Sequence, residues 1–465
     1  MIFSFATLVY GDSTTIFVPR SITNNSLFEL AMTNYSFQTD KIGLDNVIAL
    51  KSFYQNTNAG CSLRNFFLKD NKDFIILRED GQGDVNPLWT SGISQLNTSY
   101  QSGLTMAPVR TTIGAIVTAY FDLHRYLKHA WLSVNTAFVH ARHHLHLAEV
   151  DLIHKGVLRT YHNFCHMFDH PTFSIGRLTC RELTNTRLDD IQLKLGYDFS
   201  DNERRNISPY ITMMIPTGKI PENCRIFSPL VGSKNIGLGA GFNTNFELGR
   251  HVHWMVDAKY DYFFGGKQRR VFDLKNNGDW SRYLSVVTES EPYNSAPGVN
   301  SLSQEVKVTP GNIGQCWTAL HWNRNDWHIE GGYNFWIRSK EKVCLLSDRV
   351  VMPNTDDPVG ITDLIAFVPP LPPATTASTA QIQQSVIGKN PVVSDTVFTP
   401  VTVDDFNIDS ARNVRGFSHT LYLAIRYQAH EITDLYIDFA GSYEFGRTFG
   451  VANQYALWGS MTFEF

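Results

Sequence analysis

The chain has little charge for its length, few cysteines and no long apolar run. Charged residues make up 18% of the 465 residues, and the formal net charge is −4. No stretch of about 18 consecutive apolar residues occurs, which excludes a membrane protein built from transmembrane helices. A sequence pI near 6.5 argues against nucleic acid as a partner, because nucleic-acid binding requires a basic face.

Six cysteines, none in a CxxC pair, are too few for a disulfide-built scaffold and give no zinc-ribbon or thioredoxin signal. Residues 1–11 are apolar and end in small residues without a basic start, and two interpretations stay open: the remnant of a secretory signal peptide or a buried strand. Export would permit a disulfide, for example between Cys165 and Cys180, although spacing alone does not fix the pairing.

The chain does contain many aromatic residues, 13% of the total, and its apolar and polar residues alternate with a period of two. In the segment 326–338 the odd positions include Trp327, Ile329 and Phe335, whereas the even positions include Glu330 and Arg338. A helix of 3.6 residues per turn does not sort residues in this way, so the pattern predicts a strand with one apolar and one polar face.

The same pattern recurs along the chain, and the connections alternate in length. Short polar turns are expected at 201–205, 248–251, 323–325 and 429–433, and long polar segments at 144–190, 217–234, 266–311 and 339–415. Short turns at one end and long loops at the other are typical of a transmembrane β-barrel, whose strands need about 9–11 residues to cross the hydrocarbon layer.

The predicted fold class is therefore all-β: a transmembrane antiparallel up-and-down barrel of about 12 strands. The expected strands are 46–56, 111–122, 130–143, 190–200, 206–216, 235–248, 252–265, 312–323, 326–339, 416–429, 434–446 and 455–465. Fourteen strands is the alternative, because residues 57–110 could hold a further hairpin. The expected division is 1–11 as the signal remnant, 12–45 as a periplasmic or lumenal segment, and 46–465 as the barrel.

The last expected strand, Tyr455–Phe465, resembles the C-terminal strand of a known protein family. Its terminal Phe465, with Leu457, Met461 and Phe463 at alternate positions behind it, is similar to the C-terminal assembly signal of Gram-negative outer-membrane β-barrels of the porin type. Gly459 stands one place earlier than the usual pattern. The resemblance implies a location in the bacterial outer membrane, membrane lipid and the outer-membrane assembly machinery as partners, and a homotrimer as an open possibility by analogy.

Charged residues on the inward-facing positions would line the pore of such a barrel. They are Asp122, Lys194, Asp198, Glu247, Asp257, Lys259, Asp261, Glu330, Arg338, Arg426, Asp438 and Glu444. With Glu464, acids outnumber bases by nine to four, which predicts a mild preference for cations unless the charges pair across strands and fill the barrel.

The expected function is passive diffusion of small hydrophilic solutes or ions through an outer-membrane channel. Two alternatives stay open: a barrel enzyme with hydrolase activity, and a closed structural or adhesive barrel. No GxSxG motif or phosphate-binding loop occurs, so no catalytic residue, metal or cofactor is assigned. Ten of the sixteen histidines lie between His124 and His170, and a metal site there is a weaker hypothesis than a solvated rim.

Overall fold

The computed structural model describes residues 15–32, 46–57, 63, 67–69, 72, 74–78, 80–90, 101–123, 125–153, 164–199, 205–218, 225–292, 294–363, 375–385, 393–429, 435–446 and 451–464. Residues 1–11, the proline-rich segment 367–374 and Phe465 lie outside this part of the chain. None of the helices in the described ranges is long and apolar enough to cross a membrane.

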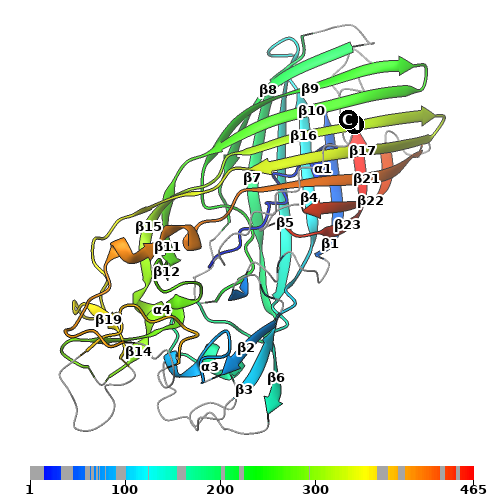
Figure 1. The fold of residues 1–465 in the computed structure, drawn as a ribbon. Coiled ribbons are helices and arrows are strands. Elements are labelled where there is room, and N and C mark those ends of the chain that lie inside the picture. The colour runs from blue at the N-terminus through cyan, green and yellow to red at the C-terminus, as the bar shows by residue number, and fades with distance from the viewer. Residues whose placement is uncertain are drawn as a thin grey trace, which may run out of the picture.

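Twelve antiparallel strands close into a barrel (Figure 1). They are β1 (Val47–Thr57), β4 (Val109–Asp122), β5 (Ala130–His144), β7 (Leu183–Tyr197), β8 (Arg205–Ile215), β9 (Gly237–Gly249), β10 (Val252–Phe263), β16 (Ile313–Arg324), β17 (Trp327–Arg338), β21 (Gly416–Ala429), β22 (Leu435–Gly446) and β23 (Gln454–Glu464). Each strand pairs with the next one in this series, and β1 pairs with both β4 and β23, which closes the sheet. The prediction of twelve strands is confirmed.

The fourteen-strand alternative is wrong because the hairpin it required lies outside the barrel. β2 (Phe74–Arg78) pairs with β3 (Gln101–Thr105), and β3 pairs with β6 (Ala148–Ile153) in a separate three-stranded sheet. The side chains of this sheet pack among themselves, since Ile75, Leu77 and Leu104 are fully buried. These strands therefore form part of a second body beyond the barrel rim.

We call this second body the loop domain; it consists of the described residues of the long connections between barrel strands (Figure 1). Its further strands are β11 (Gly266–Val271), β15 (Ser303–Thr309), β18 (Lys342–Leu345), β12 (Asp273–Leu274), β20 (Phe406–Asn407), β13 (Ser285–Thr288), β14 (Ala296–Pro297) and β19 (Val359–Ile361). Its helical turns are η3 (Pro87–Trp89), α3 (Phe164–Phe168), η4 (Ser281–Tyr283), α4 (Gly298–Ser301), η6 (Val403–Asp405) and η7 (Ile408–Ala411).

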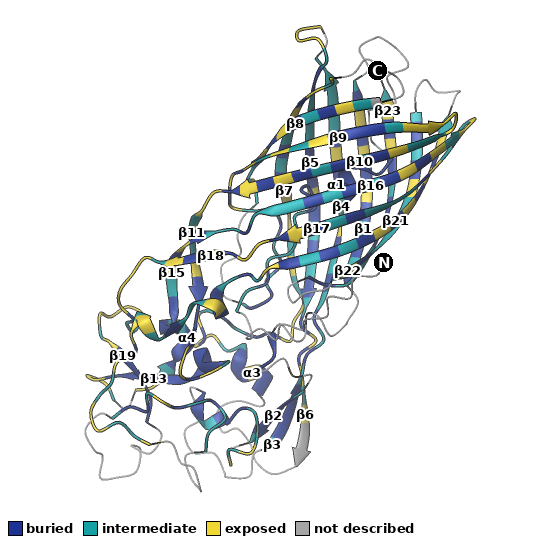
Figure 2. Ribbon diagram, turned by 45° about the horizontal axis from the view of Figure 1, so that its top comes forward, coloured by how far each residue is buried: buried dark blue, intermediate teal, exposed yellow. Residues whose placement is uncertain are grey.

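The loop domain has its own hydrophobic core (Figure 2). Trp89, Trp280 and Tyr283 are fully buried in it. A buried ion pair joins Arg282 Nη1 to Asp273 Oδ2 at 2.5 Å, and burial raises the pKa of Asp273 even though Arg282 opposes the shift. The long connections, expected from the sequence to be polar loops, are thus folded against one another.

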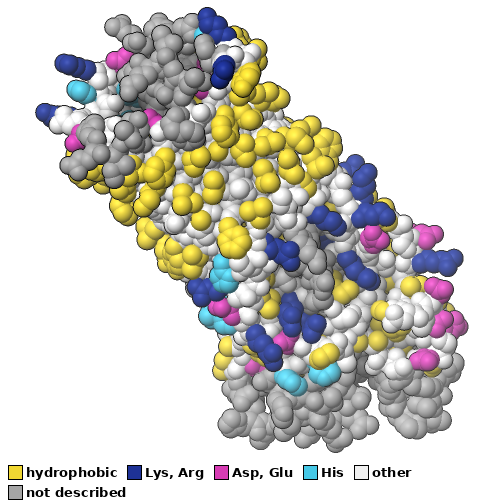
Figure 3. All heavy atoms as spheres, turned by 180° about the vertical axis from the view of Figure 1, so that it is seen from behind, with side chains coloured by type: hydrophobic (Ala, Val, Ile, Leu, Met, Phe, Trp, Pro, Cys, Tyr) yellow, Lys and Arg dark blue, Asp and Glu magenta, His cyan; other side chains and the backbone are white. Residues whose placement is uncertain are grey.

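The outer face of the barrel is apolar, as the alternation predicts. In β17 the Trp327 side chain points outward and is 52% exposed, whereas Glu330 points inward and is 1% exposed. Outward aromatic residues gather toward the two ends of the strands, with Trp254, Trp322, Trp327 and Tyr427 near the short turns and Tyr260 and Tyr262 near the long connections. Figure 3 shows a broad hydrophobic band on one side of the barrel, bordered toward the loop domain by Lys and Arg side chains.

The C-terminal strand β23 carries its apolar residues on this outer face. Leu457, Met461 and Phe463 are exposed, and their neighbours Trp458 and Ser460 are buried inside the barrel. This placement follows the alternation of a strand with one lipid-facing side. The role of these residues as an assembly signal stays a prediction.

Candidate functional site: the barrel lumen

The barrel lumen is occupied by residues 15–32, which we call the lumenal segment (Figure 1). At its start, Thr15 Oγ1 donates to the carbonyl of Val271 in the loop domain at 2.9 Å. At its end, Met32 N donates to Glu330 at 3.1 Å, close to the short turn that precedes β17. The segment therefore runs along the lumen from the end with long connections to the end with short turns.

A single helical turn, α1 (Ser26–Leu30), forms inside the lumen. The side chain of Asn25 caps it by accepting from Leu27 N at 3.1 Å, which satisfies one of the amides that a helix start leaves free. Phe28 packs on Phe53 of β1 and Trp458 of β23, each with ring centroids 5.4 Å apart. All five residues of the turn are buried, so it fills the cross-section of the barrel there.

Charged side chains of the barrel wall bind the backbone and side chains of α1. Lys51 Nζ donates to the carbonyls of Phe28 and Ala31, both at 2.7 Å, and Lys194 Nζ lies 2.7 Å from the Glu29 carboxylate. The carbonyls are the ones that a helix end leaves without intrahelical partners. Buried charges are costly unless paired, so these contacts hold the turn in one position.

A second group of charges closes the end near the short turns. Arg426 Nε donates to Asp438 at 2.6 Å, and the same guanidinium donates to the carbonyl of Met32. Tyr422 donates to Glu330 at 2.7 Å, and Ser460 donates to Asp438 at 2.5 Å. The wall thus supplies partners for the last residue of the lumenal segment on both its amide and its carbonyl.

The middle of the segment is held by amide and carboxylate groups. Lys259 Nζ donates to the side chain of Asn24 at 2.7 Å, and Gln315 donates to the Asn24 carbonyl at 2.9 Å. Asp189 accepts from Thr23 N at 2.9 Å and from Ser21 Oγ at 3.0 Å. Wall strands on different sides of the barrel therefore contribute polar contacts to the segment.

Of the twelve charged residues predicted to line the pore, nine are buried inside the barrel. These are Lys194, Asp257, Lys259, Asp261, Glu330, Arg338, Arg426, Asp438 and Glu444. Asp122 and Asp198 are half-buried near the short turns, and Glu247 is exposed at the same end. Eight of the nine form hydrogen bonds or ion pairs with the wall or the lumenal segment, whereas neither carboxylate oxygen of Asp261 has a hydrogen-bond partner within the described residues. The structure therefore shows a packed lumen.

Sequence reasoning missed Lys51, Arg110, Asp189 and the lumenal residues Arg20 and Glu29. Lys51 lies in a predicted strand, and the outward residues Ile48 and Leu50 give the parity that would have placed it inside. Arg110 stands one residue before the predicted start of its strand. Arg20 and Glu29 lie in a segment without period-two alternation, and no local signal marks them.

The histidine-rich segment does not gather into a metal centre in the described part of the chain. His143 is buried and contacts the carbonyl of Phe227 at 3.1 Å, whereas the ring of His144, the last residue of β5, lies against that of His146. Asp169, which stands beside His170 in the sequence, accepts from Thr179 at 2.9 Å. His162 lies outside the described residues.

A closed barrel with an apolar outer belt and a polar lumen pairs every strand with a neighbour and exposes apolar side chains to lipid. This is the only arrangement in which strands cross a bilayer, and it is the architecture of bacterial outer-membrane proteins. The protein is therefore an outer-membrane β-barrel of twelve strands.

Solved structures match the chain, at low sequence identity and low TM-score. No protein-family model and no curated protein sequence matches the chain. Among solved structures, an outer-membrane channel of Pseudomonas putida F1 is 7% identical with a TM-score of 0.41, covering 91% of this chain and 97% of that one. The toluene transporter TodX of Pseudomonas putida is 6% identical with a TM-score of 0.35, covering 97% and 96%. Values this low carry no information about a solute.

Proposed function

We propose that the protein is an outer-membrane channel for small hydrophilic solutes whose lumenal segment closes the pore at rest. Solute passes when residues 15–32 move away from the wall. The observation that carries the proposal is the chemistry of the lumen: polar and charged wall residues hold the segment through hydrogen bonds and ion pairs, beside an apolar cluster in which α1 packs on Phe53 and Trp458. Water can replace the polar contacts when the segment moves, and the apolar contacts set the cost of opening.

The structure changes the count of nine acids to four bases from which a mild cation preference is expected. That count omitted Lys51, Arg110 and Arg20 as well as the acids Asp189 and Glu29, and it included Glu247, which is exposed near the short turns. Most of the buried charges of both signs pair with one another or with the lumenal segment. Ion selectivity therefore depends on the state of the segment and on which charges it leaves free.

Planar lipid bilayer recordings test the proposal. The full chain is expected to show low or intermittent conductance, and a variant lacking residues 15–32 is expected to show a larger, steady conductance, because the wall residues then face water. Removal of the segment leaves buried charges unpaired, so barrel closure of both proteins is checked first by heat-modifiable gel mobility. A variant that closes as a barrel but conducts no more than the full chain contradicts the proposal.

A second candidate, a closed barrel that presents its loop domain to a partner, is favoured by the filled lumen and by the separate core of the loop domain. The same recordings separate the two. A closed binding barrel shows no opening events as the full chain, whereas a gated channel opens intermittently with the segment in place.

A further inference from the structure

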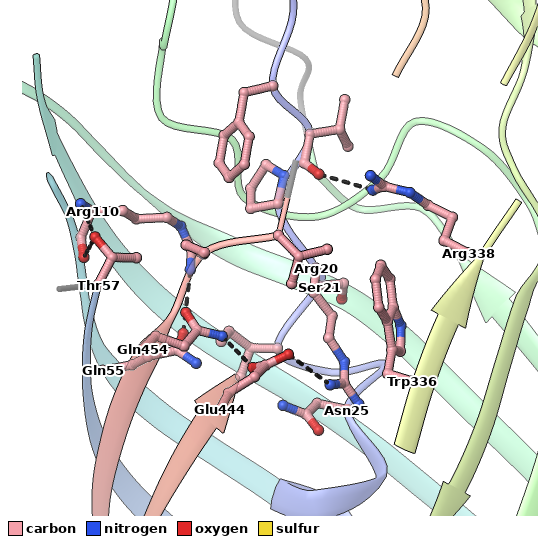
Figure 4. Close-up of a pocket in the computed structure, with 16 residues that line it drawn as sticks. Arg20, Ser21, Asn25, Gln55, Thr57, Arg110, Trp336, Arg338, Glu444 and Gln454 are labelled. Carbon is pink, nitrogen blue, oxygen red and sulfur yellow. Dashed lines mark hydrogen bonds and ion pairs between the residues drawn. The ribbon is translucent and has the colours of Figure 1, made fainter. Parts of the chain in front are cut away.

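A cavity lies at the end of the lumen nearest the loop domain, against the lumenal segment (Figure 4). Its volume is about 30 Å³, roughly the space of two water molecules or of one carboxylate group. The wall residues that matter here are Gln55 of β1, Arg110 of β4, Arg338 of β17 and Glu444 of β22. A second cavity of about 110 Å³ lies against the same stretch of the segment, Val18–Ser21.

The charges around the smaller cavity are unbalanced. Arg20, Arg110 and Arg338 line it, and Glu444 is the single acidic residue among its lining side chains. Arg110 and Arg338 are only 5% and 6% exposed. Asp189 acts on Arg110 and Glu341 acts on Arg338 through their fields. Both carboxylates already accept hydrogen bonds, Asp189 from Ser21 and Thr23 and Glu341 from Arg270 and Asn413. The cavity therefore has an excess of positive charge in a buried setting.

The one carboxylate of the cavity does not satisfy the arginines. Glu444 accepts from Gln454 at 2.5 Å and from Ser418, and Arg20 Nη1 is 3.8 Å away, beyond hydrogen-bond distance. Four buried guanidinium nitrogens have no hydrogen-bond partner within the described residues: Nε and Nη1 of Arg20, Nε of Arg110 and Nε of Arg338. Buried donors without a partner are costly, and an oxyanion is the ligand that would satisfy them.

Beside the ion pair of Arg20 with Glu444, the arginines are held in place by uncharged groups, among them Gln315, which accepts from Arg20 Nη2. The guanidinium groups of Arg20 and Arg338 both lie against Trp336, at 5.6 and 5.4 Å from the ring, as Figure 4 illustrates. Arg338 Nη1 donates to the Val18 carbonyl at 2.9 Å, and Arg110 Nη1 donates to Gln55 at 3.2 Å. Stacking and carbonyl contacts orient a guanidinium without neutralising it, so the site is preorganised for an anion.

We propose that this cluster is a binding site for the carboxylate group of a small anionic solute. The proposal rests on the proposed channel function, since it names the solute class that the lumen admits. The site lies where the lumenal segment leaves the loop domain, so a solute that enters from that side meets the arginines first. Guanidinium groups bind carboxylates through charge-assisted hydrogen bonds, and the cavity of about 30 Å³ has room for one such group.

Calorimetric titration of the full chain in detergent tests the site, with sodium acetate as the probe and choline chloride as the cationic control. Acetate is expected to bind saturably and choline not at all. Arg110→Gln is expected to weaken acetate binding by about tenfold, the effect of losing one charge-assisted hydrogen bond. Arg324→Gln, which removes the same charge at the opposite end of the barrel, is the matched control and is expected to bind acetate as the parent does.

Absence of saturable acetate binding by the folded protein overturns the inference, as does equal weakening by both variants. Binding of inorganic phosphate in preference to acetate overturns the assignment of a carboxylate. Binding is measured here without transport, so this test can fail independently of the channel proposal. If acetate does not bind but the variant lacking residues 15–32 conducts, the assignment of the solute class is wrong and the proposed channel function stands.

Discussion

Two cysteines of the loop domain are neighbours although they come from separate parts of a long connection. Cys165 is buried in α3, and Cys180 is exposed; the two thiols are hydrogen-bonded, which raises the pKa of Cys165 and lowers that of Cys180. Both are reduced in the structure, and their contact makes this pair the one that an oxidising compartment would join.

The direction of these pKa shifts predicts the order of alkylation. After mild reduction, Cys180 is expected to react with iodoacetamide before Cys165, and its reaction rate is expected to rise at a lower pH than for an ordinary thiol, because the thiolate is the reactive form. Peptide mass spectrometry across a pH series measures both. Faster modification of the buried Cys165 would contradict the arrangement.

The buried pair Lys194–Glu29 joins the wall to the lumenal segment. Glu29→Gln leaves Lys194 buried with a weaker partner, and breaking such a pair costs about 3–5 kcal/mol. Asp257 also acts on Lys194, so the lower part of that range is expected, together with more frequent opening in bilayer recordings. Denaturant unfolding followed by gel mobility gives the stability.

The matched control for this prediction is Glu305→Gln, which breaks the exposed pair Lys267–Glu305 on the loop domain. Exposed pairs contribute about 0–1 kcal/mol, so this variant is expected to unfold and conduct as the parent does. Equal effects of the two substitutions would mean that the lumenal contact is not buried in the working protein.

At the scale of elements, the sequence predicted the barrel strands but not the segment that fills the barrel lumen. Alternation placed all twelve barrel strands because a strand between lipid and lumen must sort its side chains by parity. β7 begins seven residues earlier than expected, at Leu183, because its outer end continues as the exposed residues Thr184–Leu188. The lumenal segment was not predictable in position, since its partners lie on strands far away in sequence.

Glycines on the inward face of β9 give an element-scale prediction. A Cβ at Gly241 would lie 2.6 Å from the Tyr210 ring, so Gly241→Val is expected to prevent closure of the barrel. Ala240→Val, its neighbour on the lipid face, is the matched control and is expected to close normally. Heat-modifiable mobility after refolding distinguishes them, and closure of both would show that the parity of β9 is reversed.

At the scale of the whole molecule, the chain combines a membrane barrel with a folded loop domain, and the lumenal segment belongs to both. Thr15 and Phe17 pack in the loop domain, whereas α1 lies among the barrel walls. The sequence could not predict this domain, because its apolar residues come from separate connections and show no common period. The segment therefore joins the loop domain to the barrel lumen through its contacts with both.

Disulfide trapping in membranes tests the position of the lumenal segment most directly. Ser21 Oγ contacts Asp189 at 3.0 Å, so the pair Ser21→Cys with Asp189→Cys is expected to cross-link in high yield on oxidation of isolated outer membranes. Ser21→Cys with Thr462→Cys, a buried position near the short turns, is expected to give no cross-link. Mass spectrometry of the linked peptides identifies which pair has formed. The position of the segment in the lumen is contradicted if, in a closed barrel, the cysteine introduced by Ser21→Cys links to neither wall position or links to both equally.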